Sequence, residues 1–301
     1  GYEVHALYLD IGLGGAEAAR ETAEELGLPF YVRDISQQLE EQVCRPFYAD
    51  YLAGRTPLPC ARCNRTVKFP ALMALADELG AAYVATGHYA RVSQGADGGP
   101  LLLRGRPAND QSYMLARLPR QWLGRLLFPI GGYEKTQVRA MAAELGLSVA
   151  QKPDSMEICF IPDGDYAAWL DRRGETPPPG DFIDKDGNVL GRHKGIHHYT
   201  LGQRRGLGLA LDTPVYVCKK CMADNTLTVG PEHTLYTRHL FAVDLNWIPF
   251  DRLPGPMRLA ACTRYHQREQ SVTASMDGDR LRLDFDAPQR AVTPGQAIEA
   301  A

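Results

Sequence analysis

One pattern occurs three times in the first half of the chain: a helical run ends in Glu-Leu-Gly, and a short apolar stretch follows it. The helix ends are Glu25-Leu26-Gly27, Glu78-Leu79-Gly80 and Glu144-Leu145-Gly146, and the apolar stretches cover 29–32, 82–86 and 147–149. Glycine favours the left-handed backbone that ends a helix. Helices that alternate with apolar strands predict an α/β fold, with a parallel sheet covered on both faces. Because ligands bind such sheets beyond the carboxyl ends of the strands, segments 9–10 and 86–88 are candidate binding positions.

The second half of the chain has a different pattern. A proline-rich connection at 172–180 interrupts the alternation of helices and strands. Turn signals typical of β-hairpins follow at 185–188 and 277–278, and helical patterns are rare there. A length of 301 residues leaves room for two or three domains. We therefore predict an α/β domain followed by mostly β structure.

Composition excludes several classes of protein. The 33 Lys and Arg against 36 Asp and Glu give a net charge of −3, which argues against a globally basic nucleic-acid binder but leaves room for a local basic face. No apolar stretch approaches the roughly 20 residues of a membrane span. Seven cysteines without a secretory signal indicate cytosolic thiol or metal chemistry. Both ends run directly into strand-like segments, so we expect the chain to be a fragment.

Cys60 and Cys63 form the most informative local motif. Pro57 and Pro59 hold the preceding backbone extended, and a helical pattern begins at the cysteines. A helix N-terminus and nearby cations should lower the pKa of a thiol, which would make it a nucleophile or a metal ligand. The cations are Arg62, Arg65 and Lys68. The alternative is a pair of incidental buried cysteines.

Other motifs have simpler interpretations. The segment 12–17 lacks the third glycine of a dinucleotide loop and fits a flexible strand-to-helix turn better. The segment 184–187 fits a hairpin turn better than a calcium loop. Cys218 and Cys221 lie in an expected hairpin, too far along the chain from Cys60 and Cys63 for more than a weak zinc pattern. Cys159 alone would be a core cysteine. The segment 198–208 suits either a phosphate backbone or a solvated basic turn.

Six segments in register resemble the bacterial tRNA-uridine 2-sulfurtransferases, also called tRNA-specific 2-thiouridylases. The runs are Gly54-Arg-Thr-Pro-Leu-Pro-Cys-Ala-Arg-Cys-Asn64, Ala85-Thr-Gly-His-Tyr-Ala-Arg91, Asp110-Gln-Ser-Tyr-Met-Leu115, Asp154-Ser-Met-Glu-Ile-Cys-Phe160, Tyr199-Thr-Leu-Gly-Gln-Arg-Arg-Gly-Leu-Gly208 and Ala291-Val-Thr-Pro-Gly-Gln296. They span essentially the whole chain. The resemblance implies a parallel-sheet ATP-pyrophosphatase domain (PP-loop, adenine nucleotide alpha hydrolase-like) at 1–163, a small central tRNA-binding domain at 164–235 and a C-terminal β-barrel at 236–301.

The resemblance also implies an activity and a set of site residues. The family uses ATP and Mg²⁺ to adenylate the C2 oxygen of the wobble uridine in tRNA, and then replaces that oxygen with sulfur. The implied setting is the cytoplasm, and the implied partners are tRNA and a persulfide donor protein, either a cysteine desulfurase or a relay. Cys63 takes the place of the nucleophile, Cys159 that of the persulfide carrier, and Leu9 and Gly87 those of the ATP contacts. The implied tRNA-binding residues are Leu58, Pro59, Cys60, His88, Asn109, Asp110, Gln111, Arg264, Tyr265 and Gln296.

Two departures from the family pattern affect these expectations. The phosphate loop of the family, a Ser-Gly-Gly-Val-Asp-Ser run, does not occur in this sequence, so we expect that these residues do not adenylate tRNA by themselves. Cys60 stands where some relatives carry Asp. The three cysteines Cys60, Cys63 and Cys159 are therefore also candidate ligands of an iron–sulfur cluster of the 4Fe-4S type. The resemblance leaves a persulfide route, which ends in a Cys63–Cys159 disulfide, and a cluster route open.

Two hypotheses from other classes remain. The first is a non-catalytic tRNA-binding protein that has lost the ATP loop. The second is a zinc-stabilised nucleic-acid binder that uses both CxxC pairs, and it predicts zinc that disappears on Cys218→Ser.

Overall fold

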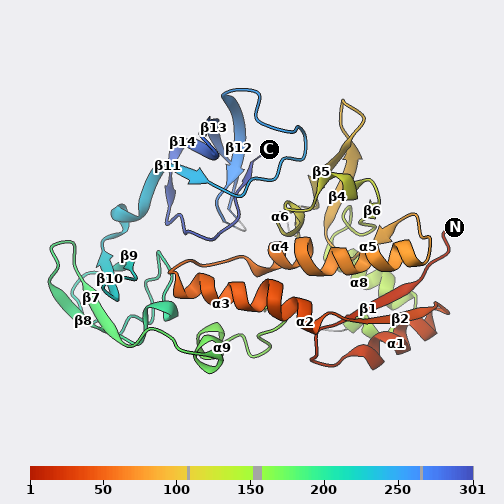
Figure 1. Ribbon diagram of the computed structural model, residues 1–301, viewed down its shortest axis with the longest axis horizontal. Helices are drawn as coiled ribbons and strands as arrows, with labels where there is room; N and C mark the ends of the chain where they lie inside the picture. Colours follow the sequence, from red (N-terminus) through yellow and green to blue (C-terminus); the bar gives the residue numbers. More distant parts are fainter. Residues whose placement is uncertain (107–108, 152–157, 265–266, 301) are drawn as a thin grey trace. The chain divides into compact units, whose positions relative to one another are not determined.

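The computed structural model describes residues 1–106, 109–151, 158–264 and 267–300, and these form two compact units. The first unit comprises 1–45, 59–162 and 246–251, and the second comprises 46–58, 163–245 and 252–301. Helices and short strands alternate in the first unit, whereas long β-strands dominate the second (Figure 1). The two halves therefore have the different characters that the sequence predicts. The predicted domain boundaries after residues 163 and 235 stay predictions.

The first unit contains short elements. They are β1 (Ala6–Asp10), α1 (Ala16–Glu25), β2 (Phe30–Asp34), α2 (Ser36–Leu39), the π-helix η1 (Glu40–Cys44), α4 (Pro59–Cys63), the π-helix η2 (Asn64–Lys68), α5 (Phe69–Glu78), β3 (Val84–Ala85), β4 (Ala90–Gln94), β5 (Pro100–Arg104), α6 (Ser112–Leu115), α7 (Arg120–Leu123), β6 (Leu126–Leu127), α8 (Lys135–Glu144) and the 3₁₀-helix η3 (Ser148–Gln151). β1 pairs with β2 and β3 with β6, both in parallel. The predicted parallel pairing is confirmed in these two separate pairs, and β4 pairs with β5 in antiparallel.

All three Glu-Leu-Gly runs end a helix in the same way. Gly27, Gly80 and Gly146 adopt φ values of 65°, 64° and 70°, in the left-handed region. In each case the glycine N–H donates to the carbonyl three residues back, and the next N–H donates five residues back. This is the Schellman arrangement, and it satisfies carbonyls at the helix end that would otherwise lack partners.

The third apolar stretch is not a strand, so that prediction is wrong. Residues 148–151 form η3 instead. The N–H of Leu147 donates to Ala142 and the N–H of Ala150 donates to Leu147. These local bonds occupy donors that a strand would offer to a neighbouring strand.

The core of the first unit lies among α5, α6, α7 and the strands β3, β4 and β6. Its buried members are Phe69, Met73, Ala76, Val84, Ala90, Leu115, Leu118, Leu123, Leu126 and Phe128. Asn246, from the part of the chain that returns to this unit, donates to the carbonyls of Ala116 and Leu118 at 2.7 and 3.0 Å. The ring of His88, in the loop that follows β3, packs against two of these core side chains, Phe69 and Phe128.

The second unit is mostly β, as predicted. Its elements are α3 (Arg45–Leu52), α9 (Tyr166–Arg173), β7 (Gly180–Ile183), β8 (Val189–His193), the 3₁₀-helices η4 (Ile196–His198) and η5 (Glu232–Leu235), β9 (Tyr216–Cys221), β10 (Thr226–Gly230), β11 (Tyr236–Ala242), β12 (Met257–Cys262), β13 (Gln270–Asp277), β14 (Arg280–Arg290) and β15 (Glu299–Ala300). Both predicted hairpins, β7–β8 and β13–β14, are confirmed. In the first, the Asp184 carboxylate accepts N–H bonds from Asp186 and Asn188, so the segment 184–187 is a turn.

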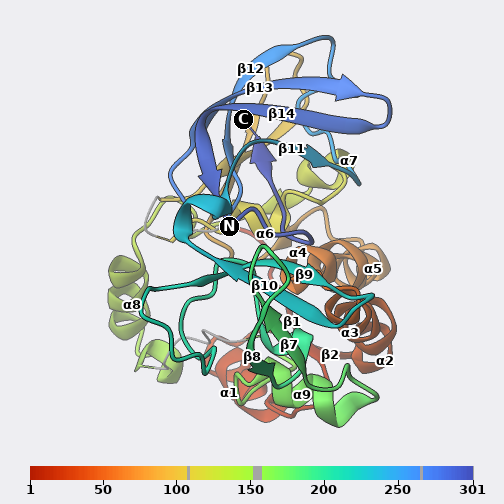
Figure 2. The ribbon, with the colours of Figure 1, turned by 90° about the vertical axis from the view of Figure 1, so that its left-hand side faces the viewer.

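Two sheets organise the second unit. A four-stranded sheet has the order β8-β7-β10-β9, and a five-stranded sheet has the order β11-β14-β13-β12-β15. The long strands of the larger sheet lie side by side in both views of the ribbon (Figure 2). A core centred on Phe182, Ile196, Tyr199, Val217 and Leu227 packs against the smaller sheet. Among the described residues, no helix is long and apolar enough to cross a membrane.

Candidate functional site

Cys60 and Cys63 lie on α4, which continues through the π-helical turn η2 into α5. Cys63 is buried, with 4% of its surface exposed, and Cys60 is partly buried. Asn64, also buried, donates to the Met114 carbonyl at 3.0 Å, and Arg62 donates to the Gln42 carbonyl at 2.6 Å. These bonds fix the helix on both sides of Cys63. Single π-turns within helices are frequent at functional sites.

The expectation that a helix N-terminus and cations lower the thiol pKa is wrong. Burial raises the pKa of Cys63 to about 11 and that of Cys60 above its usual value. Lys68 opposes this rise at both cysteines, but desolvation outweighs its charge. Cys63 is therefore a protonated thiol at neutral pH.

Cys159 is exposed, so its interpretation as a core cysteine is wrong. It belongs to the same unit as Cys60 and Cys63, and its charge raises the pKa of both. A charge on Cys159 can raise these pKa values only if its sulfur lies near the other two. The fold therefore brings together three thiols that the sequence separates, and all three are free. The segment 154–157 of the matching run lies outside the described residues.

His88 lies beside this group, in the loop after β3. Its Nδ1 is 2.8 Å from the Thr86 hydroxyl, and its ring packs against those of Phe69 and Phe128. Burial, followed by the charge of Lys68, lowers the pKa of His88 to about 4. The imidazole is therefore neutral across the physiological range.

The two residues expected to contact ATP follow or end parallel strands. Leu9 pairs with Arg33 across β1 and β2, and Gly87 is an exposed residue just after β3. A Cβ on Gly87 would meet only the Ile130 side chain, at 3.8 Å. The space around the Gly87 backbone is therefore open to a ligand. The glycine-rich segment after β1 is a strand-to-helix turn, as predicted, with positive φ at Gly12, Gly14 and Gly15.

The segment 109–111 is held by its own side chains. The Asp110 carboxylate accepts from the N–H of Gly105 and from the N–H and hydroxyl of Ser112. The Gln111 side chain accepts from the Tyr89 N–H at 3.0 Å, and Asn109 lies 3.5 Å from Glu134. Asp110 and Gln111 thus shape the loops next to His88, while their roles toward tRNA stay predictions.

Of the remaining predicted tRNA contacts that the structure describes, Leu58, Arg264 and Gln296 belong to the second unit, outside its helices and strands, and Pro59 belongs to the first. Arg264 donates to the carbonyls of Leu201 and Ala291 and to the Thr293 hydroxyl, so its guanidinium has internal partners. Gln296 donates to the Thr56 carbonyl at 2.6 Å, two residues before Leu58. Pro59 is buried at the start of α4. Tyr265 lies outside the described residues.

The second CxxC pair has local partners. The Cys218 sulfur lies 2.9 Å from the Thr234 hydroxyl, and the Cys221 thiol donates to Asp224 at 3.1 Å. Within the described residues, the one group of three potential metal ligands consists of Asp171, His197 and His198, and it includes no cysteine. The sequence reasoning missed this group because 26 residues separate Asp171 from His197. The adjacent pair His197-His198 was its only signal.

Comparisons with known proteins assign the chain to a family. Three family models match in order: a tRNA methyl transferase HUP domain at 14–163, a tRNA methyl transferase PRC-barrel domain at 168–231 and an aminomethyltransferase beta-barrel domain at 237–299. A tRNA-specific 2-thiouridylase of Heliobacterium modesticaldum is 47% identical over 95% of this chain and 76% of the relative. Those of Acetivibrio thermocellus and Clostridium botulinum are 44% and 39% identical, over 95% and 99% of the chain and 81% and 88% of the relatives. The chain belongs to the tRNA-specific 2-thiouridylase family.

Proposed function

We propose that this protein catalyses the ATP-dependent 2-thiolation of the wobble uridine in tRNA. The observation that carries the proposal is the grouping of a buried thiol, Cys63, with an exposed thiol, Cys159, in one unit. The relatives are named as tRNA-specific 2-thiouridylases. The matching family models carry methyl-transfer names, but the relatives, 39–47% identical over nearly the whole chain, support thiolation.

The first step of the proposed reaction activates the C2 oxygen of uridine. ATP enters as its magnesium complex, near the strand ends at Leu9 and Gly87. The oxygen attacks the α-phosphorus, pyrophosphate leaves, and the oxygen becomes part of an AMP leaving group. The open space at the Gly87 backbone supports this position.

The second step delivers sulfur. A donor protein leaves a persulfide on Cys159, which is exposed and therefore accessible to another protein. The Cys63 thiolate attacks the Cys159 Sγ, a Cys63–Cys159 disulfide forms, and the outer sulfur leaves as hydrosulfide carrying the electron pair of the broken S–S bond. Hydrosulfide then adds to C2 and expels AMP. An external thiol reduces the disulfide and returns both cysteines to the starting state.

Protonation of Cys63 controls this step. A thiol with a pKa of about 11 is almost entirely un-ionised at neutral pH, and the thiolate is the nucleophile. Lys68 favours the thiolate of Cys63, both through its charge and through its backbone N–H. We propose that Lys68 stabilises the thiolate while Cys63 attacks the persulfide.

We propose the persulfide route rather than an iron–sulfur cluster held by Cys60, Cys63 and Cys159. The exposed Cys159 can receive sulfur from a donor protein, and the buried Cys63 in the same unit can release it. Anaerobic iron and sulfide analysis separates the two routes, because only the cluster route requires stoichiometric iron.

The tRNA contacts are proposed for the central and C-terminal regions and for the loops beside the thiols. They comprise His88, Asn109, Asp110, Gln111, Leu58, Pro59, Cys60, Arg264, Tyr265 and Gln296. We also propose the domain division 1–163, 164–235 and 236–301. At a net charge of −3, a localised basic face has to bind the phosphates, so binding should weaken strongly with added salt.

The test measures 2-thiouridine in unmodified tRNA by nucleoside mass spectrometry, with ATP, magnesium and a persulfide source. The chain is assayed as it stands, for which we expect no thiolation because the phosphate-loop run does not occur in it, and also with an upstream Ser-Gly-Gly-Val-Asp-Ser segment, for which we expect thiolation. Cys63→Ala and Cys159→Ala should each abolish thiolation, whereas Cys218→Ala, in β9, should leave it unchanged. Specific tRNA binding without thiolation in any version would instead favour a non-catalytic tRNA-binding protein.

A further inference from the structure

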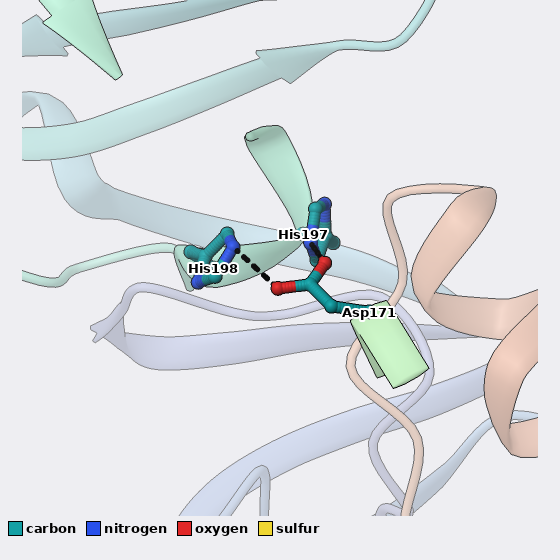
Figure 3. A group of neighbouring side chains, drawn as sticks. All are labelled: Asp171, His197 and His198. Atoms are coloured by element: carbon teal, nitrogen blue, oxygen red, sulfur yellow. Dashed lines mark hydrogen bonds and ion pairs between the residues drawn. The ribbon is translucent and has the colours of Figure 1, made fainter. Parts of the chain in front are cut away.

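Two imidazoles and a carboxylate converge in the second unit, apart from the thiols. Asp171 lies on α9, and His197 and His198 lie on η4. The Nε2 of His197 is 2.8 Å from one Asp171 oxygen, and the Nε2 of His198 is 3.4 Å from the other (Figure 3). Three ligand atoms, one from each residue, lie within 4.8 Å of one another. We propose that Asp171, His197 and His198 bind a divalent transition metal ion such as Zn²⁺.

The spacing of these atoms suits tetrahedral coordination. Bonds of about 2.0–2.1 Å from zinc to nitrogen or oxygen place neighbouring ligand atoms about 3.4 Å apart. The distance from His198 to Asp171 already has this value. The pair His197–Asp171 needs to open by only about half an ångström, which side-chain rotation about χ1 and χ2 supplies. A bound metal would replace the His197–Asp171 hydrogen bond and the His198–Asp171 ion pair with three coordinate bonds, one from each residue.

The chemistry of the ligands selects the class of metal. Two imidazole nitrogens and one carboxylate oxygen suit zinc and its neighbours in the first transition series, whereas magnesium and calcium prefer oxygen ligands.

Exposure leaves room for a fourth ligand. The side chain of His197 is 1% exposed, that of His198 25% and that of Asp171 42%. One side of the group therefore faces solvent, and a water molecule or a group from a bound partner completes the tetrahedron. Lys220 also acts on His197 through its positive charge, which opposes a cation at this group.

The site would join α9 to η4. These elements flank the proline-rich segment 174–180 and β7–β8, and Thr176 of that segment already donates to Asp171 at 2.9 Å. A bound ion would therefore hold in place the segment that leads from α9 into β7 of the four-stranded sheet. The inference does not depend on the proposed thiolation, because none of its residues belongs to that site.

The test is equilibrium dialysis of the 301-residue chain with Zn²⁺, followed by metal analysis. Asp171→Asn and His198→Gln are the test variants, and His233→Gln, at an exposed histidine outside the group, is the control. Each test variant should bind one equivalent less zinc than the wild type at a given free zinc concentration, and the control should bind the same amount. Any zinc bound by cysteines is the same in the wild type, the two test variants and the control. The difference in bound zinc between these proteins therefore reports on this site alone.

Cobalt provides the second measurement. Co²⁺ bound by two histidines and an aspartate gives visible d–d bands without the near-ultraviolet charge-transfer bands of cobalt–thiolate sites. These bands should appear in the wild type and the control and be absent from both test variants. Circular dichroism establishes that the variants are folded. Equal zinc stoichiometry and equal cobalt bands in all four proteins would overturn the inference, as would the absence of any bound metal in the wild type.

Discussion

The protonation state of Cys63 gives a quantitative prediction. A pKa of about 11 leaves about 0.1% of this thiol ionised at pH 8, whereas a cysteine of ordinary pKa, about 8.5, is about 24% ionised. Raising the pH to 10 brings the ionised fraction of Cys63 to about 9% and that of the ordinary cysteine to about 97%. The alkylation rate of Cys63 should therefore rise about ninetyfold over these two pH units. The ordinary cysteine should show only about a fourfold rise.

The assay is a time course with iodoacetamide, quantified peptide by peptide with mass spectrometry. The same Cys63 peptide in urea-unfolded protein serves as the ordinary cysteine, and folded Cys159, which is exposed, should react ahead of folded Cys63 at pH 8. Lys68→Met should slow Cys63 further, because the ammonium of Lys68 lowers its pKa. Fast alkylation of folded Cys63 at pH 8, with the shallow pH dependence of the unfolded control, would refute the reasoning.

Three further predictions concern stability. The pKa of His88 is about 4 in the folded protein and 6.5 in the unfolded chain. Protonation of His88 therefore lowers the unfolding free energy by about 3 kcal/mol. This stability is fully present above pH 6.5 and is lost as the pH falls toward 4. His88→Gln should flatten that part of the pH dependence of the unfolding free energy, and an unchanged slope would contradict the burial argument. Leu227→Ala, at a fully buried side chain, should cost about 2–5 kcal/mol in urea unfolding, and Val189→Ala, at a 62% exposed one, less than about 0.5 kcal/mol. Equal losses of unfolding free energy in the two variants would show that Leu227 does not belong to the core. Gly131→Ala would place a Cβ 1.7 Å from the Ala90 carbonyl oxygen and should cost about 1–3 kcal/mol or more, whereas Gly132→Ala meets nothing within 4 Å. Similar melting temperatures for these two variants would count against the close approach.

Local chemistry explains which parts of the fold were predictable. The glycines after α1, α5 and α8 predict helix ends because left-handed backbone is a property of the residue itself. The same pattern overpredicted a strand after Gly146, because Leu147 and Ala150 find hydrogen-bond partners within their own turn. A strand depends on a neighbouring edge, and a short apolar run does not reveal whether one is available.

The site residues also divide into those with a local sequence signal and those whose position depends on the tertiary structure. The position of Cys60 and Cys63 at a helix start follows from Pro57, Pro59 and the apolar residues beyond them. The exposure of Cys159 has no local signal, since its neighbours are apolar and suggest a core. The grouping of Asp171 with His197 and His198 depends on α9 packing against η4, which only the tertiary structure establishes.

The thiol pKa shows why charge is a weaker guide than burial. Three cations visible in the sequence predict a reactive thiolate: Arg62, Arg65 and Lys68. The side chain of Cys63 is only 4% exposed, however, and its desolvation raises the pKa by more than the charge of Lys68 lowers it. Under the proposed function this rise in pKa is useful. A buried, protonated Cys63 is protected from oxidants and from premature attack, while the exposed Cys159 meets the sulfur donor. The two thiols therefore differ in the property that each proposed role requires, and exchanging their environments would disable both.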